Sequence, residues 1–356
     1  MSDGLLVRLK PAGPWRFGSD SGARDETAEL YHSDSVYSAV TSAMETLGEL
    51  EAWLDATARS ADPAVRFSSC FPWQGGSLFV LPPRPLWPPV SPANPILRNA
   101  HFLPLSLVHQ LLNRKPLDED AWSVDPYSRC LVPSARDASQ AGPFRPVLRL
   151  RAAVDRPSRL SHGAHHAAGV EFAPDAGLWL ALTFAGESSQ SRWRGPVEAA
   201  IRLLADSGFG GQRSQGWGRS ESPEFETAGI GRVLLPAQPA GVAPPPTDAP
   251  EENPAVPEPP PPPGYWLFSL FRPGETDSVN WERSSYSLTV RGGRVLSPER
   301  PGEEKRLVRM VKEGSVISSG AAPAGSAADV APEGFPHPVY RYGFPVCLPV
   351  SVGSAA

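Results

Sequence analysis

The sequence predicts an α+β protein of two domains, and three observations lead to that class. The chain has 356 residues, which is enough for two hydrophobic cores. In residues 1–235, segments of strand pattern alternate with segments of helix pattern. A proline-rich stretch, 236–264, then separates these residues from a C-terminal domain, 265–356, whose readable segments are strands.

The first domain is expected to begin with a strand and a long helix. Residues 5–10 alternate between an apolar face and a face that carries Lys10, as in a half-buried strand. Apolar residues then recur at helical spacing over 33–54. Ser33 or Asp34 is the expected cap of this helix, because a short polar side chain can accept hydrogen bonds from the unpaired amides of the first turn.

The rest of the first domain surrounds a large insertion, 82–143. The insertion is dense in proline and has one helical candidate at 105–113. It also carries aromatic side chains that are expected to anchor it, either to its own domain or to a neighbour: Trp87, Trp122 and Tyr127. Outside the insertion, the second helix is expected at 196–207, and further strands at 65–71, 77–81, 146–154, 169–184 and 220–225.

Without its insertions, the first domain has the order strand, helix, strand, strand, helix, strand. This is the split βαβ order of ferredoxin-like, or RRM-like, folds, in which both helices cover one face of an antiparallel sheet. The RNP aromatic signature of an RRM does not accompany it. We therefore expect a ferredoxin-like first domain that carries the insertion and a hairpin over 146–184.

A glycine-rich segment, Gly208 to Arg219, follows the second helix and reads Gly-Phe-Gly-Gly-Gln-Arg-Ser-Gln-Gly-Trp-Gly-Arg. Phosphate-binding loops of nucleotide-binding folds precede a helix and use its N-terminus, whereas this segment leaves the opposite end. Glycine amides can still turn toward a phosphate, Arg213 adds charge, and Trp217 offers a ring for a base. The alternative is a tight helix-to-strand turn with solvated arginines.

A helix, a loop with an Arg-Ser-x-Gly-aromatic-Gly-Arg core and a strand together resemble the signature of the RAMP proteins of CRISPR systems. Three further segments narrow the resemblance: 31–39 (Tyr-His-Ser-Asp-Ser-Val-Tyr-Ser-Ala), 67–73 (Phe-Ser-Ser-Cys-Phe-Pro-Trp) and 308–316 (Val-Arg-Met-Val-Lys-Glu-Gly-Ser-Val). In this order they look like subunit four of the Csm complex, the type III-A effector. The resemblance covers most of the chain and implies that 265–356 is a second, degenerate ferredoxin-like domain.

The resemblance also implies a non-catalytic RNA-binding subunit without cofactor or metal. Its partners would be the guide RNA, whose 5′ handle it would hold, the large polymerase-like catalytic subunit and the backbone RAMP subunit. The expected RNA contacts lie in the glycine-rich segment, the first strand, the start of the first helix and the hairpin tip: Gly208, Gly210, Gly211, Arg213, Ser214, Gly216, Trp217, Gly218, Arg219, Lys10, His32, Ser33, Arg156 and Arg159.

Other interpretations stay open. His32 could be the general base of a RAMP endoribonuclease that processes precursor guide RNA, although the sequence shows no partner at readable spacing. His162, His165 and His166 could bind metal, but a hairpin tip that touches a nucleic-acid backbone is favoured because no cysteine or carboxylate pairs with them. The equivalent subunit of a type III-B complex would differ only in its partners.

Composition limits the remaining function classes. A formal charge of -5 confines nucleic-acid contact to a local basic groove, and three distant cysteines argue against a disulfide framework. We expect a cytoplasmic protein without membrane contact, because the N-terminus lacks a signal-peptide pattern and apolar runs fall short of about 18 residues. The stretch 236–264 is expected to be a semi-rigid linker, and 318–333 a mobile loop.

Overall fold

The computed structural model of the chain describes residues 4–18, 26–89, 93–135, 142–229, 231, 234, 264–297, 300 and 302–351. These residues form helices and antiparallel sheets, so the expected α+β class is confirmed. The expected linker lies outside the described residues, apart from Gly264.

One antiparallel sheet organises the N-terminal part, residues 4–234. Its strands follow the order β11-β1-β10-β3-β4-β5, and β2 also pairs with β10. Strand β10 is almost entirely buried between β1 and β3, as its apolar sequence favours. The strands are β1 (Gly4–Leu9), β2 (Val65–Phe67), β3 (Phe71–Gln74), β4 (Ser77–Val80), β5 (Leu103–Pro104), β10 (Ala176–Phe184) and β11 (Glu224–Ala228).

Three helices pack with this sheet: α1 (Ser33–Thr46), α2 (Leu50–Ala56) and α4 (Glu187–Ser207). The single helix expected over 33–54 is wrong, because Gly48 adopts a φ of 77° and separates α1 from α2. Helix α4 begins earlier than expected, so Pro196 lies in its interior and costs it one main-chain hydrogen bond.

The middle strands also differ from the expectation. The strand expected at 65–71 is divided into β2 and β3 by two buried serines, Ser68 and Ser69. The Ser69 amide donates to the Phe268 carbonyl of the C-terminal part, so this break turns the main chain toward the second half of the molecule. The last strand was expected at 220–225, and β11 starts at Glu224 instead.

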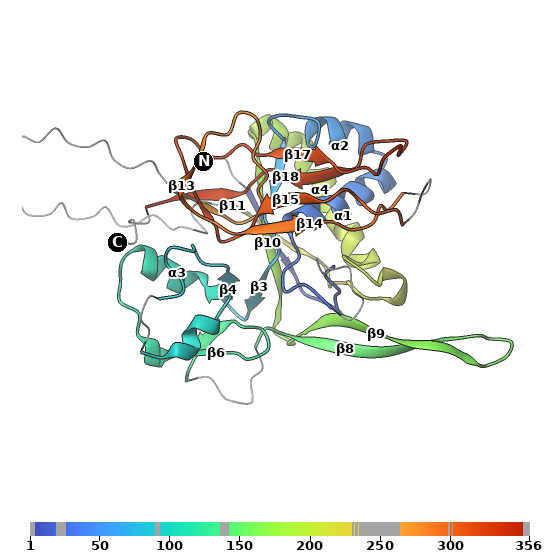
Figure 1. Cartoon of the computed structure of the whole chain (residues 1–356), viewed down its shortest axis with the longest axis horizontal. Coiled ribbons are helices and arrows are strands. Elements are labelled where there is room, and N and C mark those ends of the chain that lie inside the picture. Colours follow the sequence, from blue (N-terminus) through green and yellow to red (C-terminus); the bar gives the residue numbers. More distant parts are fainter. Residues whose placement is uncertain are drawn as a thin grey trace, which may run out of the picture.

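A long hairpin, β8 (Phe144–Val154) and β9 (Ser161–Phe172), projects from the rest of the chain (Figure 1). Residues 146–154 were expected to pair with 169–184, with the three histidines in the loop between them; that pairing is wrong. The histidines lie in β9, and the turn is 155–160. Alanine and glycine have low strand propensity, which hid β9 in the sequence.

The insertion carries η1 (Pro95–Asn99), α3 (Leu105–Leu112), η2 (Glu119–Ala121), β6 (Trp122–Val124) and β7 (Leu131–Pro133). The expected helix at 105–113 is confirmed. Trp87 is buried and donates from Nε1 to the Ala100 carbonyl at 3.0 Å, so it anchors the insertion from within. Tyr127 is 65% exposed, so it does not anchor the insertion to its own domain, and an anchoring contact with a neighbouring protein stays a prediction.

The C-terminal part, residues 264–351, contains strands but no helix among its described residues. One sheet has the order β13-β16-β12-β19, and two further pairs are β14-β15 and β17-β18. The mobile loop expected at 318–333 is wrong, because Ser326–Asp329 forms β17. The strands are β12 (Gly264–Leu267), β13 (Val279–Ser285), β14 (Leu288–Arg291), β15 (Val308–Val311), β16 (Val316–Ser319), β17, β18 (Tyr340–Gly343) and β19 (Cys347–Val350).

The two parts share one hydrophobic core. Helix α1 packs against β18 (Figure 1). The Tyr37 and Tyr342 rings stack with their centroids 4.0 Å apart. The Tyr342 hydroxyl donates to the Val65 carbonyl at 2.6 Å, and Trp266 Nε1 donates to the Leu81 carbonyl at 3.1 Å. Side chains of the second half therefore complete the core of the first.

Candidate nucleic-acid interface

The glycine-rich segment is a compact turn that its own glycines make possible. Gly208, Gly210, Gly216 and Gly218 have positive φ angles of 101°, 70°, 79° and 81°. A Cβ on Gly218 would overlap the Phe209 main chain, and one on Gly210 would overlap the Arg16 carbonyl oxygen. Gly208, Gly210 and Gly218 thus serve internal packing, as in the tight-turn alternative.

Position 211 needs a glycine less than positions 210 and 218 do. Its φ lies outside the left-handed region, and a Cβ there would meet only the Arg16 side chain, at 3.2 Å. Its amide donates to the Arg16 carbonyl at 3.0 Å, so this group is already used inside the protein. The segment 13–18 therefore forms one wall of the turn.

The outer edge of the turn is Gln212, Arg213 and Ser214. Their three successive amides donate to no main-chain carbonyl of the described residues. With Ser207 they line a wide hollow of 530 Å³ on the surface. Amides and one guanidinium around an open hollow can hold a phosphate oxygen, whereas they supply no group for proton transfer.

Trp217 is 3% exposed and packs toward Gly169 at the base of the hairpin. The expectation that its ring stacks on a base does not fit this burial. The Arg149 guanidinium of β8 lies over the ring instead, 5.8 Å from its centroid. The glycine-rich segment and the hairpin base are therefore in direct contact, which the sequence did not indicate.

Basic side chains extend from this contact along the hairpin. Arg145 and Arg149 share the carboxylate of Glu171, at 3.2 and 2.6 Å, and both remain half-exposed. Arg156 and Arg159 are exposed in the turn that ends the hairpin. Alternation along β8 places Arg145 and Arg149 on one face, a signal available in the sequence once the strand is recognised.

Two other expected contacts lie near the turn. Lys10 is paired with Glu221 at 3.1 Å, and both side chains are half-exposed. Arg219 is exposed, and its carbonyl accepts a hydrogen bond from Trp15 Nε1 at 3.0 Å. Both cations are accessible, so the structure leaves their expected role in binding as a prediction.

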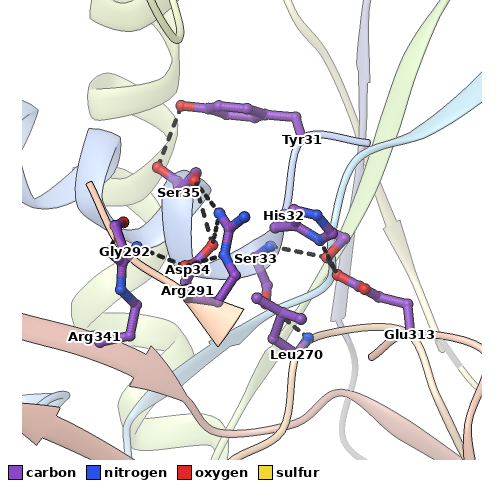
Figure 2. Close-up of polar contacts among 11 residues, drawn as sticks. Tyr31, His32, Ser33, Asp34, Ser35, Leu270, Arg291, Gly292, Glu313 and Arg341 are labelled. Carbon is purple, nitrogen blue, oxygen red and sulfur yellow. Dashed lines mark hydrogen bonds and ion pairs between the residues drawn. The ribbon is translucent and has the colours of Figure 1, made fainter. Parts of the chain in front are cut away.

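His32 and Ser33 lie at the junction of the two parts, as Figure 2 shows. His32 Nδ1 lies 2.8 Å from Glu313 Oε1, and His32 is 8% exposed. The Ser33 amide donates to Ser69 Oγ at 2.8 Å, and Ser33 Oγ accepts from the Leu270 amide at 3.0 Å. Ser33 is 1% exposed, so we leave it out of the proposed RNA contacts.

Glu313 is the partner that the sequence did not reveal for His32. Burial alone would raise the pKa of this carboxyl, but His32 and the hydrogen bonds from His32 and Ser69 hold it below its usual value. A buried carboxylate that orients an imidazole is a geometry shared by structural pairs and general bases. Only their separation in sequence hid this pair.

Asp34 is not a helix cap. His32 occupies the cap position of α1 and its side chain makes no capping bond. The Asp34 carboxylate instead accepts hydrogen bonds from Arg291 Nε at 3.0 Å and Arg341 Nη1 at 2.6 Å (Figure 2). Burial would raise the pKa of Asp34, but the two guanidinium charges hold it well below its usual range.

The described residues contain no group of three or more metal-binding side chains, and none of their helices is long and apolar enough to cross a membrane. The charged side chains that serve the junction are His32, Asp34, Arg291, Glu313 and Arg341. The candidate interface therefore comprises the outer edge of the glycine-rich turn and the basic face of the hairpin.

Known proteins share the fold of this chain. Residues 262–350 match the family model of the CRISPR Csm4 C-terminal domain. A chain of the Csm3-Csm4 subcomplex of the type III-A CRISPR-Cas interference complex shares 16% identity, with 98% of this chain and 100% of that chain covered and a TM-score of 0.63. A chain of the Csm1-Csm4 cassette in complex with pppApA shares 16% identity, with 99% of this chain and 100% of that chain covered and a TM-score of 0.55. No curated protein matches the sequence.

The fold is therefore that of chains found in type III-A CRISPR effector structures. Residues 262–350 carry the Csm4 C-terminal domain by its family model, and the expected resemblance to subunit four of the Csm complex is confirmed.

Proposed function

We propose that the protein is a non-catalytic RNA-binding subunit of a type III-A CRISPR interference complex. It holds the 5′ handle of the guide RNA, docks the large catalytic subunit at the foot of the complex and contacts the backbone RAMP subunit in the cytoplasm. The family match supports the complex, and the solved assemblies with Csm1 and Csm3 support the two protein partners.

The observation that carries RNA binding is the open edge of the glycine-rich turn. Three successive amides and the Arg213 guanidinium line one hollow, and Arg149 continues the positive charge onto the hairpin. On an acidic protein this is the local basic groove that single-strand binding requires. The strand order β11-β1-β10-β3, with α1 and α4 packed together, also supports a ferredoxin-like first domain.

The test is binding of the purified chain to single-stranded RNA that carries the handle. Wild-type protein should bind, and replacing Arg213 and Arg149 by Ala should weaken binding, whereas Arg202→Ala on α4 should not. Arg202 is a matched control because it is half-exposed and paired with Glu198. Equal affinities for all three proteins, or no binding by the wild type, would contradict the proposal.

A RAMP endoribonuclease is the second candidate, and the His32–Glu313 pair favours it. His32 lines an open cavity of 670 Å³, so its imidazole borders a space that a ligand could enter. Incubation with unprocessed repeat RNA in chelator separates the two functions. A discrete cut by the wild type, absent with His32→Ala, would establish the enzyme; binding without a cut supports the scaffold. A type III-B subunit is less favoured, because the family match is to Csm4.

A further inference from the structure

A second anion site is suggested by an excess of buried positive charge beneath α1. Arg291 and Arg341 are 6% and 5% exposed, and both donate to the single carboxylate of Asp34. Lys305 lies in the same neighbourhood, since its amide donates to the Gly293 carbonyl while Arg341 Nη2 donates to the Gly292 carbonyl. Among the described residues, Arg291, Arg341 and Lys305 therefore lie around the Asp34 carboxylate.

Lys305 is the cation without a partner. Its amine makes no hydrogen bond or ion pair with the described residues, and it is only half-buried. Burial and the Arg341 charge lower the pKa of Lys305 to about 8, with Asp34 opposing them. Arg341 Nε is buried and also lacks a partner among the described residues. Such clusters are stabilised when an anion supplies the missing charge.

The Lys305 side chain lines an open cavity of 510 Å³ between α1, α2 and the C-terminal part. This cavity shares Ser42, Glu45, Leu296 and Ser297 with a second hollow of 490 Å³. The second hollow shares Ser207 and Arg213 with the hollow at the glycine-rich turn. The three hollows thus adjoin one another along α1 from Arg213 to Lys305, and we call this series of hollows the groove.

Hydroxyl groups line the middle of the groove. Ser38, Thr41, Ser42 and Thr46 follow one face of α1 and border it. The hydroxyls of Ser42 and Thr46 donate to carbonyls one turn earlier in α1, so their oxygens still accept hydrogen bonds. A ribose 2′-hydroxyl can donate to such oxygens, whereas DNA has no equivalent group.

We propose that this groove carries the ribose-phosphate backbone of single-stranded RNA beyond the glycine-rich turn, with Arg213 holding a phosphate at one end and Lys305 at the other. The inference rests on the proposed function, because it assumes that RNA enters at Arg213. RNA is favoured over an acidic protein segment because the groove is continuous with the turn and its middle is lined by hydroxyls. The exposed Glu45 lines both the 510 Å³ cavity and the 490 Å³ hollow, and its carboxylate then faces the bases.

Binding is tested with handle-containing RNA and with DNA of the same sequence. Lys305→Ala should weaken RNA binding about tenfold, the effect of one charged hydrogen bond, and should lower the salt slope by about 0.7. Arg306→Ala is the matched control, because it removes the neighbouring charge from a side chain that is 61% exposed and outside the cavity. Loss of the RNA-over-DNA preference on replacing Ser42 and Thr46 by Ala would support the path along α1.

Chemical modification measures whether RNA covers Lys305 in the wild-type protein, without a mutation. An amine-acylating reagent should modify Lys305 in the protein alone, and bound RNA should protect it, whereas the exposed Lys115 of the insertion should react equally in both states. If wild type binds RNA through Arg213 but Lys305 stays reactive and Lys305→Ala binds normally, the groove inference is overturned and the proposed function stands. If wild type binds no RNA, both fail. Protection only on adding protein subunits would assign the groove to a protein.

Discussion

Arg341 of strand β18 donates a hydrogen bond to Asp34 of helix α1, with Nη1 2.6 Å from Oδ2. The two residues belong to opposite halves of the chain, and both are buried. Arg291 donates to the same carboxylate at 3.0 Å. A buried ionic cluster therefore fixes how the first helix lies on the C-terminal part, and its loss should be felt by the whole fold.

Asp34→Asn should lower the free energy of unfolding by about 3–5 kcal/mol, because it leaves two buried guanidinium groups without their counter-charge. Urea unfolding followed by tryptophan fluorescence measures the change. Asp62→Asn is the control: Asp62 pairs with Arg66 at 3.4 Å, but its side chain is 80% exposed, so the cost should stay below about 1 kcal/mol. Equal midpoints for both variants would show that the cluster does not hold the junction.

Acid should weaken the same junction. The folded-state pKa of Asp34 lies below its unfolded value of about 3.9, so its stabilisation is present above that pH and is lost as pH falls toward the folded value. Glu313 acts in the same direction. We expect the urea midpoint to fall steeply below about pH 4, and to fall less in Asp34→Asn. Parallel pH curves for the two proteins would contradict this linkage.

The glycine positions in the turn should differ in how well they tolerate a residue with a side chain. Gly218→Ala would push a Cβ into the Phe209 main chain at a φ of 81°, whereas Gly216→Ala meets only open space at a similar φ of 79°. The strain of the left-handed region, about 1 kcal/mol, is common to both. Thermal unfolding should therefore show a larger loss for Gly218→Ala. Gly211→Val should cost less still, because Gly211 has no left-handed φ and a Cβ there meets only the Arg16 side chain. Similar losses at all three positions would refute this ranking.

Arg213 should contribute one phosphate contact. Arg213→Ala should lower the affinity for single-stranded handle RNA and reduce its dependence on salt by about 0.7 log units per log unit. Titration at several salt concentrations measures the slope, with Arg202→Ala as the matched arginine control on α4. A slope that Arg213→Ala leaves unchanged would mean that this side chain faces solvent in the complex.

Local patterns predicted much of the fold. The alternation of 5–10 identified β1, and helical spacing placed α1, α3 and the end of α4. Strand β9 was missed because alanine, glycine and histidine carry little strand signal, and its pairing depends on the long partner β8. The glycine-rich turn was found as a local motif. Its contact with Arg149 could not be found, because hairpin register sets it.

The junction was the least predictable part of the site. His32, Ser33 and Asp34 were read as a cap and an RNA contact, because adjacent polar residues at a helix start usually satisfy local amides. Their partners, Glu313, Leu270 and Arg341, stand more than two hundred residues away. Local spacing cannot distinguish an aspartate that caps a helix from one that forms ion pairs with arginines of another domain.

The shared core has a consequence for how the chain could be made. Because Tyr342 stacks on Tyr37 and Trp266 bonds the Leu81 carbonyl, each half completes the interior of the other. Two separately synthesised polypeptides, one ending after Leu234 and one starting before Gly264, should therefore find each other and reconstitute the native interior. The covalent connection in the intact chain would then speed assembly by raising the local concentration of each half. The structure that forms would be determined by the two surfaces that pack together.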